Sequence, residues 1–480
     1  MADMYSVNAV VHGLREALHQ YLEAQYHIWD EGIVVERRRL FETPGTTYQE
    51  PWIEATPFYV TGRQYRDLRL PELVKKFLEE LAGFNVGVFE TPYEHQAKAI
   101  ELVVADHRDV IISTGTGSGK TESFLIPILG QLVIESQVAP QSTSLAGCRA
   151  ILLYPMNALV NDQVARLRRL VGDKRVASKF LELRKRVVRF GMYTSRTPYP
   201  GPRSAKRDKE RLAPLFEKLF RVSAEKQVEL EAEGKWPAKD MAKFEAQEYV
   251  TSPEDRELFT RDEFREACPD VLVTNYSMLE YMLLRPIESR IFDQTRGWLR
   301  SNEKNVLTIV LDEAHVYRGA AGAEVAMLLR RLQSRLGVDR SKLRFILTSA
   351  SLGGSPEATE QMKSFAADLT GLRDRDQPFE VVQGTIDRPA LSGTPTKKEI
   401  EALTDVDLKA VNEFSVDLAA ALREVNRFLV KIGLGGISKD VDEADFRDAL
   451  FHRLRETAAA ALLANLATGK ALPYRELLEK

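Results

Sequence analysis

A glycine-rich segment in the first third of the chain has the residue types and the spacing needed to hold a run of phosphates. The segment reads Thr114-Gly115-Thr116-Gly117-Ser118-Gly119-Lys120-Thr121. Glycines allow the backbone to wrap closely around an anion and to point successive N–H groups at it. The lysine of such a loop neutralises the β- and γ-phosphates, and the Thr121 hydroxyl ligates Mg²⁺. A predicted strand over 109–113 and a predicted helix over 120–133 flank the segment, which favours a nucleotide site over a simple glycine-rich turn.

An acidic pair directly follows another apolar run, Leu307–Leu311. The carboxyl ends of parallel strands face the ligand crevice, so we expect this pair to lie beside the phosphate loop. We assign Asp312 to the metal ion, directly or through water, and Glu313 to orienting and deprotonating the attacking water. His315 is expected one turn further on, where it would sense the γ-phosphate. Together with Lys120, these residues form a predicted site for ATP hydrolysis.

Six short apolar runs predict the sheet that positions these groups. They lie at 110–112, 151–154, 187–190, 271–273, 307–311 and 345–347. The runs are continuous rather than alternating, which is typical of strands buried on both faces of a parallel sheet. Helical segments separate them, and strand–helix alternation indicates a doubly wound α/β domain.

The remaining pattern divides the chain into four parts. Residues 1–85 are predicted to be an accessory region with helices near 10–22 and 71–82, and residues 86–375 the nucleotide-binding domain. A charged, mostly helical insertion at 198–266 interrupts that domain; it is either a solvated excursion or a contact with a ligand. A connector at 376–396 leads to a helical region at 397–480, where Leu418, Ala421, Leu422, Val425 and Leu429 share one helical face.

Bulk composition excludes several classes of protein. The 480 residues carry 67 basic and 70 acidic side chains, a net charge of −3, which gives no global signal of nucleic-acid binding. The two cysteines, Cys148 and Cys268, cannot form a disulfide framework or a cysteine-based zinc site. The N-terminus does not resemble a signal peptide, and no apolar run is long enough to span a membrane. We therefore expect a cytoplasmic protein.

The motifs resemble those of superfamily 2 helicases of the DEAH-box kind. Residues 114–121 resemble motif I, Asp312-Glu313-Ala314-His315 resembles motif II, and Ser349-Ala350-Ser351 resembles motif III, which links the state of the nucleotide to the grip on nucleic acid. Residues 91–96 are similar to the Q-motif, in which Gln96 would read the edge of the adenine. The resemblance implies a RecA-like P-loop domain that uses ATP and Mg²⁺.

Two further segments resemble motifs that contact the backbone of a nucleic-acid strand. Residues 154–159 are similar to motif Ia, which implies contacts from Pro155 and Asn157. Residues 273–276 are similar to motif Ib, which implies contacts from Thr274 and Asn275. Amide, hydroxyl and backbone groups suit contacts with phosphates that do not depend on base sequence.

A finer resemblance concerns the residues around motif II. The segment 312–319, with Arg330-Arg331-Leu332 in the next helix, resembles the MrfA-type branch of bacterial DEAH helicases. That branch includes DNA-repair helicases and large helicases of anti-phage systems of the DISARM and Druantia type. No arginine-finger motif of a second RecA-like lobe follows Ser351, so we expect this chain to be the portion with the first lobe. The second lobe would belong to the same longer chain or to a partner subunit.

Three functions remain open on the sequence. The first is an ATP-driven helicase or translocase on single-stranded nucleic acid, with DNA favoured, in anti-phage defence or DNA repair. The second is an ATP-gated clamp or scaffold that recruits other proteins of a defence or repair complex without separating strands. The third is an RNA helicase, because backbone contacts do not distinguish the sugars unless a 2′-hydroxyl is read.

Overall fold

A computed structural model describes residues 7–473 and 476 of the chain, apart from 44, 50, 116, 199–202, 205, 207, 213, 215, 216, 218–221, 351–354, 374–376, 391, 392, 439, 469 and 470. Thr116 and Ser351, two predicted site residues, lie outside the described residues. The structure has two compact units, one formed by residues 59–385 and the other by residues 1–58 together with 386–480.

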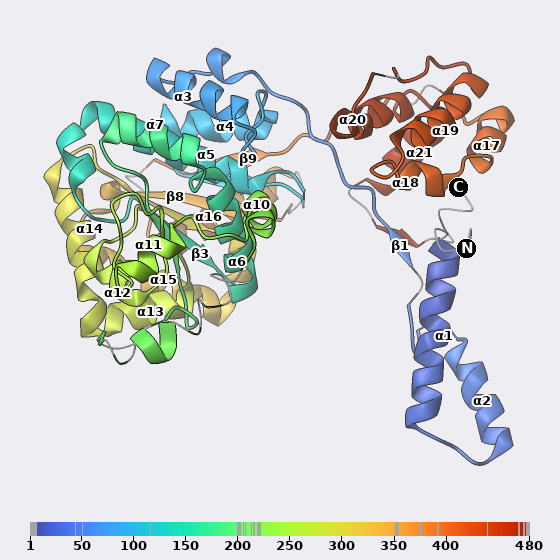
Figure 1. The fold of residues 1–480 in the computed structure, drawn as a ribbon, viewed down its shortest axis with the longest axis horizontal. Helices are drawn as coiled ribbons and strands as arrows, with labels where there is room; N and C mark the ends of the chain where they lie inside the picture. The colour runs from blue at the N-terminus through green and yellow to red at the C-terminus, as the bar shows by residue number, and fades with distance from the viewer. Residues whose placement is uncertain are drawn as a thin grey trace. The chain divides into compact units, whose positions relative to one another are not determined.

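An eight-stranded parallel sheet forms the centre of the 59–385 unit (Figure 1). Its spatial order is β5-β4-β6-β3-β7-β8-β2-β9. The strands are β2 (Val110–Ser113), β3 (Ala150–Tyr154), β4 (Phe190–Tyr193), β5 (Glu257–Leu258), β6 (Val271–Asn275), β7 (Leu307–Leu311), β8 (Leu343–Ser349) and β9 (Glu380–Gln383). This arrangement confirms the predicted α/β class with a parallel sheet.

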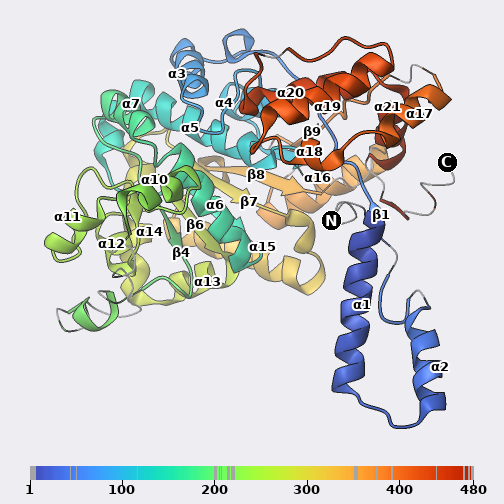
Figure 2. The same cartoon turned by 45° about the vertical axis from the view of Figure 1, so that its right-hand side comes forward.

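Each face of the sheet carries its own apolar core, because successive strand residues point to opposite sides. Val110 and Ile112 of β2 pack in one core, and Ile111 between them packs in the other. The helices whose buried residues complete the first core are α3 (Glu72–Gly83), α4 (Glu94–Val104), α5 (Lys120–Val138), α6 (Asn157–Leu170) and α7 (Lys174–Arg184). Those of the second core are α12 (Arg261–Glu266), α13 (Tyr276–Leu284), α14 (Ser289–Ser301), α15 (Gly319–Leu336) and α16 (Pro356–Thr370). The domain is therefore a three-layer α/β/α structure (Figure 2).

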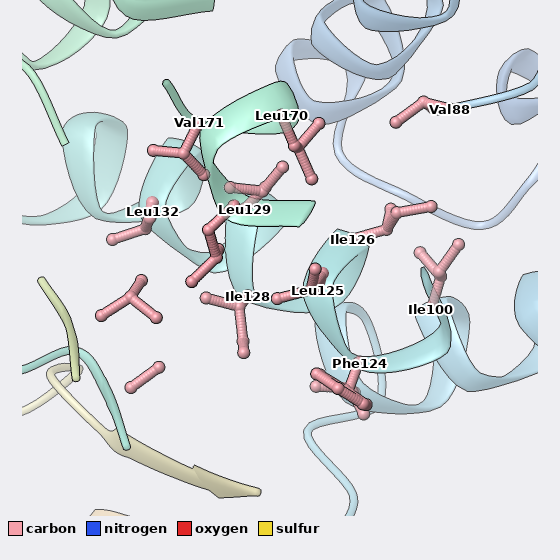
Figure 3. Packing of buried hydrophobic residues seen from close by; sticks show 14 of the residues in the cluster. Val88, Ile100, Phe124, Leu125, Ile126, Ile128, Leu129, Leu132, Leu170 and Val171 are labelled. Atoms are coloured by element: carbon pink, nitrogen blue, oxygen red, sulfur yellow. The ribbon is translucent and has the colours of Figure 1, made fainter. Parts of the chain in front are cut away.

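Helix α5 lies at the centre of the first core and fixes the position of the phosphate loop at its start. Most of its side chains are buried, so the helix is not amphipathic and packs against its neighbours on several sides. Figure 3 shows Leu129 of α5 near Leu170, the last residue of α6, and near Val171, which follows it. A helix held this firmly gives the loop before it a rigid base.

The predicted strands are largely confirmed, with differences that have physical reasons. The run 187–190 was expected as a strand, but the ladder of β4 begins only at Phe190. Val187 and Val188 are buried before the ladder starts, so the apolar run marks burial rather than strand pairing. Strand β9 lies within 376–396, where the sequence predicted only a connector, and pairs with β2.

The insertion between β4 and β6 is helical in most of its described parts. It contains α10 (Ala224–Ala232), α11 (Met241–Ala246), α12 and the single turn η4 (Asp208–Leu212), but also β5, which adds an edge strand to the sheet. A small core of its own includes Met241, Phe244 and the partly buried Trp236.

The second unit contains two helical groups. Near the N-terminus, α1 (Val7–Gln25) and α2 (Glu31–Phe41) precede the short β1 (Trp52–Ile53), which pairs with β10 (Leu472–Pro473). The C-terminal helices are α17 (Lys397–Thr404), α18 (Leu408–Asn412), α19 (Leu418–Lys431), α20 (Glu443–Leu454) and α21 (Ala458–Ala467). The predicted face of α19 is confirmed, since Ala421, Leu422, Val425 and Leu429 are buried together. Among the described helices, none combines the length and the apolar character that crossing a membrane requires.

Candidate nucleotide-binding site

The phosphate loop connects β2 to α5 and requires glycine at defined positions. Gly117 and Gly119 have φ angles of 74° and 69°, in the left-handed region that residues with a Cβ rarely adopt. A Cβ atom on Gly119 would also lie 2.3 Å from Nε2 of Gln96. The loop is therefore shaped by conformations and by a close approach that only glycine permits.

Helix α4 supports the loop from behind through two side chains. Nε2 of His95 lies 2.9 Å from the carbonyl oxygen of Ser118, and the Gln96 amide donates to the Gly119 carbonyl at 3.0 Å. The oxygen of that amide accepts a bond from the Tyr93 backbone N–H at 2.9 Å. Both ends of Gln96 are thus occupied by backbone groups in this structure, and its contact with adenine stays a prediction.

Tyr59 occupies a backbone donor of the loop, a contact that sequence reasoning missed. Its hydroxyl accepts a hydrogen bond from the Gly115 N–H at 3.1 Å, and its ring packs near those of Tyr93 and His95. The side chain is almost fully buried, and this burial raises the pKa of the phenol. Tyr59 precedes the loop by more than fifty residues and belongs to no recognisable motif, so the sequence held no signal for it.

The two predicted acids lie at the carboxyl end of β7, where a buried threonine of β8 holds them. Leu311 pairs with Leu347, so Asp312 lies opposite Thr348. The Thr348 hydroxyl donates to Oδ1 of Asp312 and accepts from the backbone N–H of Glu313 at 3.1 Å. Burial raises the pKa of Asp312 because it disfavours the charged carboxylate, while the bond from Thr348 acts in the opposite direction. The sequence predicted a role for Ser349 and the two residues after it, but not for Thr348.

Glu313 has a strained backbone and an ion pair with the loop lysine. Its φ of 49° lies in the left-handed region, which costs a non-glycine residue about 1–3 kcal/mol. Its Oε1 lies 3.1 Å from Nζ of Lys120. The structure therefore brings the predicted base and the predicted phosphate lysine into direct contact, although 193 residues separate them in the chain.

His315 connects motif II with motif III. Its Nδ1 lies 3.3 Å from Oε2 of Glu313 and 3.4 Å from the backbone N of Ala350. The first contact requires a proton on Nδ1 and the second requires a lone pair, so the protonation state decides which of the two is made. Ser349 is buried, and among the described residues its hydroxyl has no hydrogen-bond partner.

The oxygen donors near the loop fit Mg²⁺ bound together with a nucleotide. Thr121 and Asp312 each offer one side-chain oxygen ligand, and the Gln163 amide lies 3.5 Å from the Thr121 hydroxyl. Within the described part of the chain there is no group of three or more His, Cys, Asp or Glu residues suited to hold a metal ion. Mg²⁺ in nucleotide sites is held by one or two protein oxygens plus phosphates and water, so the residues present fit that ion.

The predicted nucleic-acid residues lie at the ends of neighbouring strands. The Asn275 amide donates to Oδ1 of Asn157 at 2.6 Å, which links the ends of β6 and β3. Pro155 is half-buried beside them. Thr274, however, is fully buried, and its hydroxyl donates to the carbonyl of Tyr193 at 2.6 Å. The structure thus brings the two asparagines together and turns the Thr274 side chain toward β4; contact of all four residues with nucleic acid stays a prediction.

Two parts of the chain, which together contain this site, match a known protein family. Residues 93–189 and 234–359 match the DEAD/DEAH box helicase family, and the gap between the two matched parts falls in the region of the insertion. These two parts of the chain are therefore similar to a DEAD/DEAH box helicase domain, and members of that family use ATP.

Two curated proteins and one solved structure are similar to this chain. The Druantia protein DruE of Escherichia coli (strain UMEA 4076-1) is 45% identical over 98% of this chain and 27% of its own length. An uncharacterized ATP-dependent helicase of Methanocaldococcus jannaschii is 25% identical over 55% of this chain and 26% of its own length. The crystal structure of the DUF1998 helicase MrfA bound to DNA is 18% identical, covers 85% of this chain and 46% of that chain, and has a TM-score of 0.39. The chain thus spans about a quarter of the length of these two curated relatives.

Proposed function

We propose that the protein is an ATP-dependent helicase or translocase that acts on nucleic acid in the cytoplasm, with DNA as the favoured substrate. The proposal rests on one observation. Lys120 and Glu313 form an ion pair beside Asp312, at the carboxyl ends of β2 and β7. An acid that orients water, an acid for the metal ion and a lysine for the phosphates are the groups that ATP hydrolysis requires. The DEAD/DEAH family match supports the same reaction.

The residues have separate roles in the proposed reaction. Lys120 and the loop amides bind the phosphates, and Thr121 with Asp312 holds Mg²⁺, which supplies positive charge against the phosphate oxygens. Glu313 orients the attacking water and accepts its proton. Its ion pair with Lys120 holds it in place before the phosphates bind, and binding gives Lys120 a second anionic partner.

A second RecA-like lobe is part of the proposal. Among the described residues, no arginine forms an ion pair with Asp312 or Glu313; Asp312 is buried, and the Glu313 side chain keeps 27% of its surface accessible. We propose that another lobe, in a longer form of the same protein or in a partner subunit, closes over the site and supplies the arginine finger that the family resemblance implies.

We further propose a role in anti-phage defence, supported by the 45% identity with the Druantia protein DruE. The alternative, an ATP-gated scaffold, would use the same ATP site but would recruit other proteins without separating strands. The resemblance of residues 312–319 to MrfA-type helicases supports DNA over RNA.

One set of assays tests the proposed motor once the second lobe is present. We expect single-stranded DNA to stimulate ATP hydrolysis more than a matched RNA, and we expect ATP-dependent strand displacement. Glu313→Gln should abolish both while preserving ATP binding. Hydrolysis without displacement would favour the scaffold, greater stimulation by RNA would favour an RNA helicase, and full turnover by Glu313→Gln would remove Glu313 from its role as the base.

A further inference from the structure

A basic groove lies on the helical face of the domain, apart from the nucleotide site. Its volume is 860 Å³, and its walls come from residues 85–89, the end of α6, the start of α7, and residues 228–238 of the insertion. Six cationic side chains line it: Arg166, Arg168, Arg169, Lys174, Arg175 and Arg256. The insertion thus forms one wall, and the segment 85–89 with helices α6 and α7 forms the other, so the groove exists only because both are present.

Half of these cations are already neutralised. Carboxylates lie within 2.7–2.9 Å of three of them, in the pairs Arg166–Glu122, Arg168–Glu257 and Arg175–Asp173. Arg169, Lys174 and Arg256 form no ion pair with any described residue, and Nε of Arg256 is buried without a hydrogen-bond partner. Glu231 is the remaining carboxylate of the lining and accepts a bond from Gln227. Four carboxylates, Asp173, Glu231, Asp255 and Glu257, act on the charge of Arg256. The excess of positive charge in the groove therefore comes mainly from the exposed Arg169 and Lys174, which favour an anionic ligand.

An exposed aromatic ring lies at the same groove. Phe89 lines it with 74% of its surface accessible, while Val86 and Val88 beside it are buried and anchor the segment. Exposed rings beside arginines suit nucleic acid, because bases stack on the ring while phosphates bind the cations. An acidic peptide would use the cations but has no comparable use for Phe89.

The groove lies at the far end of α6, the helix that begins at motif Ia. Arg169 follows Asn157 by twelve residues of α6, which corresponds to about 18 Å along the helix axis. That distance equals about five stacked nucleotides of one strand. A single strand of nucleic acid that binds at the end of β3 therefore reaches the groove within about five further nucleotides.

We propose that this groove binds the sugar-phosphate backbone of a nucleic-acid strand, as a second contact beyond motifs Ia and Ib. Arg169, Lys174 and Arg256 bind the phosphates, and Phe89 stacks on a base. The inference rests on the proposed function, because it assumes that the protein binds nucleic acid. In this proposal the insertion forms one wall of the groove in which the nucleic-acid strand binds.

The test uses the 480-residue chain and a fluorescent 30-nucleotide single-stranded DNA. Binding anisotropy is measured at several salt concentrations for the wild type and for the double variant Arg169→Glu/Lys174→Glu. A matched control, Lys398→Glu/Arg423→Glu, makes the same charge change at exposed residues of α17 and α19. We expect the groove variant to bind about tenfold more weakly and to lose about 1.4 from the slope of log affinity against log salt, as two lost phosphate contacts predict.

Phe89→Ala adds a test that does not change charge. It should weaken binding about tenfold through lost stacking, with an unchanged salt slope. All variants should keep the wild-type affinity for ATP and the wild-type melting temperature, which shows that the fold and the nucleotide site are intact.

The outcomes separate the groove from the proposed function. Strong binding by the wild type and equal binding by the groove variant would overturn the groove while leaving the helicase proposal standing. No binding by the wild-type chain would overturn the groove, whereas the helicase proposal is tested by strand displacement with the second lobe present. A groove variant that loses binding of a poly-glutamate peptide but keeps binding of DNA would show that the occupant is an acidic protein segment.

Discussion

At the scale of single residues, Thr348 organises the acidic end of the site. One hydroxyl donates to the Asp312 carboxylate and accepts from the Glu313 backbone N–H, so it fixes the metal ligand and the strained residue next to it. The sequence predicted both acids, because an acidic pair after an apolar strand is distinctive. Thr348 was not predicted, since a threonine inside a buried strand looks like an ordinary core residue.

Replacing this hydroxyl should disturb the metal ion more than the fold. In Thr348→Val the shape is kept, but the carboxylate of Asp312 and the N–H of Glu313 lose their shared partner. We expect the Mg²⁺ concentration for half-maximal nucleotide binding to rise about tenfold, as is usual when a partner of a metal ligand is removed. Thr370→Val is the control, because the hydroxyl of that buried threonine bonds only to its own helix. Equal Mg²⁺ dependence in both variants would show that Thr348 does not position the metal ligand.

The phenol of Tyr59 should oppose nucleotide binding. Its hydroxyl occupies the Gly115 N–H, which the phosphate loop needs for its ligand. Tyr59→Phe removes that competing acceptor, so we expect ATP to bind about three- to tenfold more tightly, in line with about 0.5–1.5 kcal/mol for one hydrogen bond. Tyr65→Phe, which removes the phenol of another buried tyrosine outside the loop and outside the Q-motif segment, should leave the affinity unchanged. Weaker binding by Tyr59→Phe would mean that the hydroxyl supports the bound nucleotide instead.

At the scale of elements, continuous apolar runs predicted most of the sheet, because strands buried on both faces must be apolar throughout. Two edge strands were missed for the same reason. β5 has only two residues, and β9, with the sequence Glu380-Val381-Val382-Gln383, is half-exposed and reads as a polar connector. The run before β4 was displaced by three residues, since burial begins before strand pairing does.

A buried charge network holds the amino-terminal ends of the central strands. Asp270, just before β6, is fully buried among three arginines, Arg149, Arg184 and Arg186. Glu135 of α5 pairs with the first two of them. Burial favours the neutral form of each carboxyl, but the arginines outweigh it, so the pKa of Glu135 is lowered to about 2 and that of Asp270 is lowered as well.

This network should make the fold sensitive to acid and to loss of one partner. Groups whose pKa is lowered by folding contribute stability at neutral pH, and that stability is lost as the pH falls from about 5 toward 2. Asp270→Asn should lower the free energy of unfolding by about 3–5 kcal/mol, because it leaves buried arginines uncompensated. Denaturant melts at pH 7 and pH 4 measure both effects, with the exposed Asp405→Asn as control. A loss below about 1 kcal/mol for Asp270→Asn would contradict the role given to the network.

At the scale of the whole molecule, a net charge of −3 conceals a local excess of positive charge in the groove beside the insertion. Composition alone therefore gave no signal of a nucleic-acid partner, and only the fold brings Lys174 and Arg256 to one surface. The structure divides the chain into two compact units, one of them formed by residues 59–385. The division into four parts that the sequence indicated stays a prediction.

The isolated chain should show only part of the proposed activity. Without a second RecA-like lobe to supply an arginine finger, the 480-residue chain should bind ATP weakly and should displace no strand from a duplex. A strand-displacement assay with the isolated chain checks this, and ATP-dependent unwinding by the chain alone would show that the site needs no second lobe.

The central claim is that the loop at 114–121 and the acids after β7 form one MgATP site. Its most direct test is equilibrium binding of ATP to the 480-residue chain, with and without Mg²⁺. We predict Mg²⁺-dependent binding by the wild type, at least tenfold weaker binding by Lys120→Ala, and loss of the Mg²⁺ dependence in Asp312→Asn. Equal affinity and equal Mg²⁺ dependence in all three proteins would contradict the claim.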